Sequence, residues 1–172
     1  MNTTTVTPRS GRELISDEFA DVVATVLDNN PGMTRGVAER VVSQAVAFVA
    51  TAASGTIGIA PSRVVDEGWH ALVLDTRLYA RLCGRLGAFV HHQPERPGAA
   101  GYHPDWLTHT MAEIRSAGFD VDDELWLAPG DSSIAVAAPA QHTPNGPNCA
   151  PIVTVPKPKP KGTPQPVPVD TV

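Results

Sequence analysis

Two short segments in the middle of the chain hold residues whose types and spacing fit a chemical site. Residues 65–70 read VDEGWH and residues 91–94 read HHQP. Asp66 and His70 are four residues apart, so on a helix they lie on one face, where the carboxylate can orient the imidazole and stabilise its charge. Trp69 is expected to point into the core beside them.

The histidines, with a cysteine nearby, lead to the hypothesis of a zinc or iron site. In this hypothesis His70 and one of His91 or His92 are the ligands, and Asp66 orients a ligand from behind. Cys83 is a further candidate ligand. The sequence indicates no cofactor other than zinc or iron.

Helix geometry restricts which of these residues can share a metal ion. On one straight helix, His70 and Cys83 would be about 20 Å apart and rotated by about 140°. The helix would also carry the chain about 25 Å beyond His70, whereas the few residues that follow it reach back only about 14 Å. A site that joins His70 to His91 or His92 therefore requires a helix break near Asp75.

Each candidate also has an ordinary structural interpretation. The pair His91-His92 is typical of a solvated turn, and neighbours in an extended segment point in opposite directions, so only one of the two is expected to face inward. Cys83 shares a helical face with Tyr79, which favours a buried thiol in the core. His70 can simply satisfy a buried hydrogen bond.

Hydrophobic periodicity predicts the helices that would position these residues. The expected fold class is all-α, a compact bundle of about four to five helices closed by a strap over 119–127. The expected helices cover 17–29, 35–53, 63–87 and 104–117, of which 63–87 is either one long helix or two helices broken near Asp75. Signatures of other catalytic sites, such as a Gly-rich phosphate loop, GxSxG, HExxH or paired CxxC, do not occur.

Composition divides the chain into a flexible N-terminus over 1–12, a helical domain over 13–128 and a disordered C-terminal tail over 129–172. Ten prolines fall in the 34 residues from Pro139 onward. Such a segment favours extended polyproline II and buries too little apolar surface to fold. The tail is therefore a candidate tether, or a ligand for a protein partner with an aromatic groove.

The charge balance narrows the class of partner. A net charge of −5 argues against binding to nucleic acid or to an anionic membrane. The uncharged stretch 41–62 contains several polar residues and glycines, which indicates a buried helix rather than a membrane span. The first residues lack a signal-peptide pattern, and two cysteines make no disulfide framework, so we expect a cytoplasmic protein.

The pattern VDxxWH at 65–70, followed by Leu74, Tyr79 and Cys83, resembles that of the glycine-rich domain-containing protein-like family. Its small actinobacterial branch is the most similar, and the resemblance covers about 15–128. Plant members often have His-Pro where this chain has Asp75-Thr76, and a proline there would favour a helix break. The resemblance implies no particular reaction.

Three functional hypotheses follow from these residues. The first is a helical interaction module whose recognition surface includes Asp66, Trp69, His70 and Tyr79, with the tail as a tether. The second is a small metal-binding protein or metal-dependent enzyme that uses His70 with His91 or His92. In the third, the Trp-His motif is purely structural. Binding is favoured over catalysis.

Overall fold

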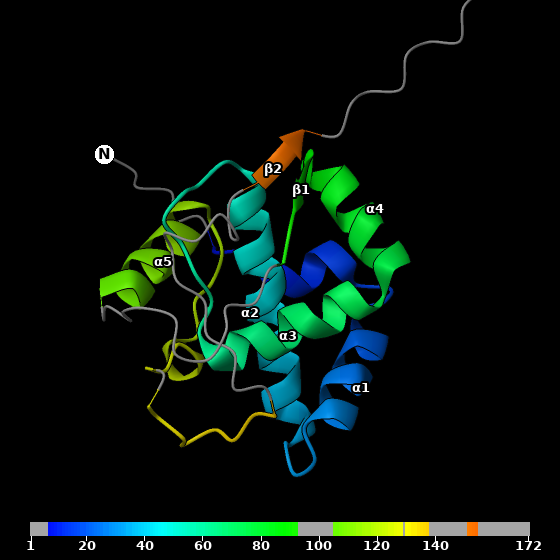
Figure 1. Cartoon of the computed structure of the whole chain (residues 1–172), viewed down its shortest axis with the longest axis vertical. Coiled ribbons are helices and arrows are strands. Elements are labelled where there is room, and N and C mark those ends of the chain that lie inside the picture. The colour runs from blue at the N-terminus through cyan, green and yellow to red at the C-terminus, as the bar shows by residue number, and fades with distance from the viewer. Residues whose placement is uncertain (1–6, 93–104, 129, 138–150, 155–172) are drawn as a thin grey trace, which may run out of the picture.

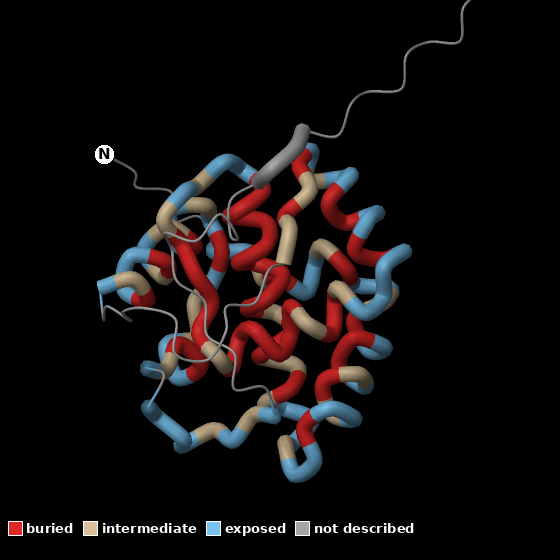
Figure 2. The backbone as a smooth tube through the Cα atoms, viewed as in Figure 1, coloured by how far each residue is buried: buried red, intermediate tan, exposed pale blue. Residues whose placement is uncertain are grey.

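Helix α2 (Arg35–Ala53) runs through the centre of the molecule, and the other elements pack around it (Figure 1). Thirteen of its 19 residues are buried, which is typical of a helix covered on all sides. Small side chains dominate its second half, so neighbouring helices approach it closely. Figure 2 shows the buried residues gathered where the helices face one another.

The computed structural model describes residues 7–92, 105–128 and 130–137, and the backbone of 151–154. Within these residues the predicted all-α bundle is confirmed, and the three helices predicted at 17–29, 35–53 and 104–117 have ends within two residues of those observed. The other α-helices are α1 (Phe19–Asn29), α3 (Arg63–Leu74), α4 (Thr76–Leu86) and α5 (Asp105–Ser116), and the short 3-10 helices are η1 (Gly11–Ile15) and η2 (Asp123–Leu125).

The region predicted as one helix or two is two helices, and Asp75 separates them. Its backbone leaves the helical conformation, with φ −85° and ψ 82°. Its Oδ1 accepts a hydrogen bond from the backbone N–H of Leu78 at 2.9 Å, which caps α4. In Figure 1 α3 crosses α2, whereas α4 turns away from α3 and leads toward strand β1.

Helices α2 and α3 approach each other most closely at Gly68. A Cβ atom at Gly68 would lie 2.7 Å from the Cβ of Ala45 and 2.9 Å from the carbonyl oxygen of Val41. Only glycine leaves room for this approach. The crossing places the two residues that follow, Trp69 and His70, at a fixed depth relative to the core.

Strand β1 (Ala88–Val90) follows α4 after Gly87, whose positive φ of 87° ends the helix. It pairs in antiparallel orientation with β2 (Pro151–Thr154), with Ala88 opposite Thr154. The sequence did not lead us to expect β2, because proline dominates the tail composition. Its β-branched residues Ile152, Val153 and Thr154 nevertheless favour an extended backbone.

Both ends of the predicted domain extend further than composition suggests. The backbone of Arg9 donates to Gly118 at 2.9 Å and accepts from Asp120 at 3.0 Å, so order begins inside the predicted flexible N-terminus. Beyond residue 128, Ile134 packs against the core, and the N–H of Ala137 donates to Asn30. The remainder of the predicted tail, β2 excepted, lies outside the described residues. No described helix has the length and apolar character that crossing a bilayer requires.

Candidate metal centre

The first turn of α3 is held in place by Ser62. Its hydroxyl accepts a hydrogen bond from the N–H of Val65 at 3.1 Å and donates to the carbonyl of Leu125 at 2.6 Å. Serine is a preferred residue at this capping position. The strap after α5 is therefore tied to the start of α3, and Asp66 lies one turn into a helix whose origin is fixed.

Asp66, His70 and His92 converge on one point. The Nε2 atom of His70 lies 3.3 Å from Oδ2 of Asp66, and the Nε2 atom of His92 lies 3.0 Å from Oδ1. The two imidazole centroids are 4.6 Å apart. The three ligating atoms all lie within 4.8 Å of one another, which makes this the one such group of three within the described residues.

Burial makes the carboxylate of this group unusual. The side chain of Asp66 is 1% exposed, that of His92 is 7% exposed and that of His70 is 26% exposed. A buried carboxylate is costly unless a positive charge compensates it. Protonated imidazole and a metal cation can both do so at this position. Since His70 is the most exposed of the three, the group opens to solvent beside it.

The spacing between Asp66 and each of the two histidines matches a metal coordination shell. Metal–ligand distances of about 2.0–2.2 Å place neighbouring ligand atoms about 2.8–3.1 Å apart in octahedral geometry and about 3.3–3.6 Å apart in tetrahedral geometry. The two separations between imidazole nitrogen and carboxylate oxygen, 3.0 and 3.3 Å, fall in these ranges. Two histidines and one carboxylate suit zinc or iron(II), and three protein ligands leave coordination positions for water or substrate.

The helix break at Asp75 brings two of the predicted ligands together. Of the two neighbouring histidines, His92 joins the group, whereas the ring of His91 packs against Phe89 at 4.7 Å between centroids. The sequence placed Asp66 behind the ligands. In the structure its two oxygens face the histidines directly, so Asp66 is also a candidate ligand.

The other predicted site residues lie behind this group. Trp69 and Tyr79 are 0% and 3% exposed, so neither contributes to an exterior surface. Cys83 is also buried and is not part of the three-residue group. Burial raises the pKa of its thiol, and the neighbouring Tyr79 and Val90 offset part of this rise. The burial favours the interpretation of Cys83 as a core thiol.

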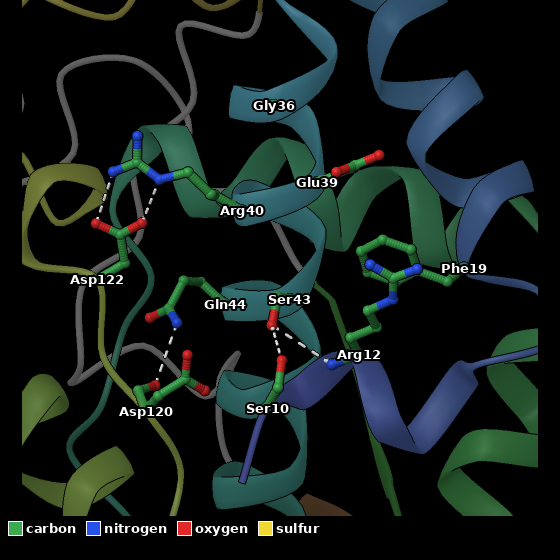
Figure 3. Close-up of a pocket in the computed structure, with 10 residues that line it drawn as sticks. All are labelled: Ser10, Arg12, Phe19, Gly36, Glu39, Arg40, Ser43, Gln44, Asp120 and Asp122. Atoms are coloured by element: carbon green, nitrogen blue, oxygen red, sulfur yellow. Dashed lines mark hydrogen bonds and ion pairs between the residues drawn. The ribbon is translucent and has the colours of Figure 1, made fainter. Parts of the chain in front are cut away.

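A separate polar cleft of about 230 Å³ lies between η1, α2 and the segment after α5 (Figure 3). Arg40 binds Asp122 through two nitrogens and also reaches Glu124. These hydrogen bonds hold the pKa of Asp122 below its ordinary value, whereas burial raises the pKa of Asp120. Sequence reasoning missed this cleft because its residues are scattered from Ser10 to Asp122 with no motif that joins them.

Comparison with known families places the candidate metal centre within a recognised segment. Residues 16–98 match the UCP032817-like family model. The match to the UCP032817-like model covers just under half of the chain and includes Asp66, His70 and His92, whereas α5 and the strap that follows lie outside it. Neither a curated protein nor a solved structure matches the chain.

Proposed function

We propose that this protein is a small metal-binding protein in which Asp66, His70 and His92 hold one zinc or iron(II) ion. The observation that supports the proposal is the convergence of two imidazole nitrogens on one carboxylate that is 1% exposed. Such a carboxylate needs a compensating cation, and both imidazoles already face it at ligand spacing.

The proposed ion would have a protein side and a solvent side. Asp66 and His92 approach it from the core, and His70 stands at the boundary with solvent. Water would fill the remaining positions, and a bound metal lowers the pKa of such a water. The proposal concerns metal binding, and no substrate or reaction is assigned to the site.

Elemental analysis of untagged full-length protein, purified without chelator at neutral pH, tests the proposal. We expect about one metal equivalent per chain, as for a site with three protein ligands. Asp66→Asn, His70→Ala and His92→Ala should each lose it. His91→Ala is the matched control, because it removes a neighbouring imidazole that lies outside the group, and it should keep the metal.

Two results would contradict the proposal. One is folded wild-type protein that holds no metal after addition of zinc or of iron(II) under reducing conditions. The other is a His92→Ala variant that retains the same metal content as the wild type. A purely structural role for the Trp-His motif predicts the first result, together with lower thermal stability of His70→Ala.

A second candidate function, an interaction module, rests on the tail. Strand β2 pairs with β1, so the Pro-Lys run at 156–160 begins two residues after an anchored strand. A polyproline segment attached in this way suits docking on an aromatic groove of a protein partner. In a pull-down, a partner retained by the full chain and lost from a chain ending at residue 154 would support this role.

The finer family and location assignments are proposals as well. The spacing of Trp69, His70 and Tyr79 supports membership of the small actinobacterial branch of the glycine-rich domain-containing protein-like family. Because the chain has only two cysteines and Cys83 is a buried free thiol, we place it in the reducing cytoplasm. Fractionation of expressing cells, with detection of the full chain, tests the location.

A further inference from the structure

Trp69 and Tyr79 belong to the spacing pattern of the Trp-His motif, yet neither is in the metal group. We infer that Tyr79 is a positioning residue that sets His92 against Asp66 and His70, acting through Trp69 and the backbone of Val90. This inference rests on the proposed metal site and identifies what holds its third ligand in place.

The hydroxyl of Tyr79 joins two parts of the chain that carry the histidines. It accepts a hydrogen bond from Nε1 of Trp69 at 2.9 Å and donates its own proton to the carbonyl oxygen of Val90. All three residues are buried, so water does not compete for these hydrogen bonds. One hydroxyl therefore connects α3, α4 and the end of β1.

The two bonded partners adjoin the two histidine ligands. Trp69 directly precedes His70 on α3, and Val90 stands two residues before His92. His92 lies beyond the end of β1, outside any helix or strand, so the strand pairing by itself does not fix its position. The hydrogen bond from Tyr79 fixes the last carbonyl of β1, where the segment toward His92 begins.

Trp69 also supplies the surface on which His92 rests. The His92 ring meets the indole nearly edge-on, with centroids 4.5 Å apart and an angle of 76° between planes. Phe48 of α2 packs on the same indole at 5.2 Å between centroids. The indole is thus held by the core and by Tyr79, and its remaining side orients the imidazole of His92.

Tyr79→Phe tests the inference, because it keeps the ring and removes only the hydroxyl. Thr110→Val is the matched control: the Thr110 hydroxyl, also buried, accepts from the N–H of Ala60 and donates to the carbonyl of Trp106. Each variant thus loses one hydroxyl that makes two hydrogen bonds in the interior. The hydroxyl lost in Tyr79→Phe is the one that bonds Trp69 and Val90, the residues that position the histidines.

Two measurements on full-length protein separate positioning from stability. The first is the affinity for Co²⁺ and the visible absorption spectrum of the complex, which reports ligand geometry. Loss of a residue that orients a metal ligand typically lowers metal affinity about 10–100-fold. We expect a loss of about this size and an altered spectrum for Tyr79→Phe. Thr110→Val should match the wild type in both.

The second measurement is NMR of the His92 ring protons in metal-free protein, assigned with His92→Ala. The ring current of Trp69 shifts these signals, and Tyr79→Phe should move them toward the values of an unpacked histidine while Thr110→Val leaves them in place. Unchanged His92 signals and unchanged Co²⁺ affinity in Tyr79→Phe would overturn the inference. If wild-type protein binds no Co²⁺ but Tyr79→Phe moves the signals, positioning stands and metal binding fails.

Discussion

The carboxylate of Asp66 decides the chemistry of the candidate site, because it is the most buried charge in the group. Without metal, the Nε2 atoms of both imidazoles face that charge at 3.0 and 3.3 Å. With metal, both imidazoles must present an unprotonated nitrogen. Metal binding therefore releases protons, and affinity falls as the solution becomes acidic. The metal content of the protein should therefore be measured near neutral pH, where protons compete least for the imidazole nitrogens.

The ion pair between Arg40 and Asp122 in the polar cleft predicts how the stability of the protein depends on pH. Arg40 lowers the folded-state pKa of Asp122 from its ordinary value of 3.8. Its contribution is therefore present above that unfolded value and is lost as pH falls through the lower folded value. We expect Asp122→Asn to cost about 1 kcal/mol at pH 7 and to flatten the acid limb of stability.

Asp120 is the control for this prediction, because its pKa is shifted in the opposite direction from that of Asp122. Burial raises its folded-state pKa, so its protonation favours the folded state and adds stability as pH falls through that value. Asp120→Asn removes this gain, so the free energy of unfolding should fall more steeply with decreasing pH than in the wild type. Urea unfolding of both variants between pH 3 and pH 7 measures the slopes. Equal slopes in the wild type and Asp122→Asn would show that the Arg40 pair contributes nothing.

Part of the candidate site could be predicted from residue spacing. The four-residue interval places Asp66 and His70 on one helical face whatever the rest of the fold, and alternation requires only one of His91 and His92 to face inward. Which of the two does so depends on how β1 is held. That in turn depends on the Tyr79 hydrogen bond, which spacing does not reveal.

At the scale of elements, the helix break at Asp75 is the feature that makes the site. Sequence left this break open because aspartate followed by threonine fits both a cap and a helix interior. Tertiary packing decides it, since α4 must turn to contact β1 and bring His92 back to α3. The helices themselves were predictable, because their apolar residues recur with a period of 3.6.

The crossing of α2 and α3 leads to a prediction about Gly68. An added Cβ would meet Ala45 and the backbone of Val41, so Gly68→Ala forces the helices apart. We expect it to lower the free energy of unfolding by about 1–3 kcal/mol. Because His70 lies half a turn further along α3, the displacement should also weaken metal binding.

Gly84 offers a matched control on α4. It is exposed, and a Cβ there meets nothing within 4 Å. Gly84→Ala should therefore raise stability by about 0.5–1 kcal/mol through helix propensity alone. Urea unfolding followed by circular dichroism measures both variants. A Gly68→Ala variant as stable as Gly84→Ala would mean that α2 and α3 are not in close contact at Gly68.

At the scale of the whole molecule, the chain closes on itself through segments distant in sequence. Arg9 pairs with the residues after α5, Ala137 bonds to Asn30 after α1, and β2 pairs with β1. Composition alone placed one partner of each of these three contacts in a segment predicted to be flexible or disordered, because short backbone pairings need few apolar residues. Each depends on a partner strand or turn that only the folded domain provides.

The pairing of β2 with β1 yields a prediction from two truncations. A chain ending at residue 154 keeps the strand, and a chain ending at residue 150 removes it. The first should unfold at the temperature of the full chain. The second loses a few backbone hydrogen bonds worth about 0.5–1.5 kcal/mol each, and about 1 kcal/mol shifts the melting temperature by about 2–4 °C at this chain size.

Thermal unfolding followed at 222 nm measures all three chains, and the helical signal at 20 °C should stay equal because the removed residues belong to no described helix. The pairing also has a functional consequence, since β1 leads directly to His92. The chain ending at residue 150 should therefore bind Co²⁺ more weakly than the chain ending at residue 154. Equal melting temperatures and equal Co²⁺ affinity for the two truncated chains would show that pairing with β2 contributes neither to stability nor to the position of His92.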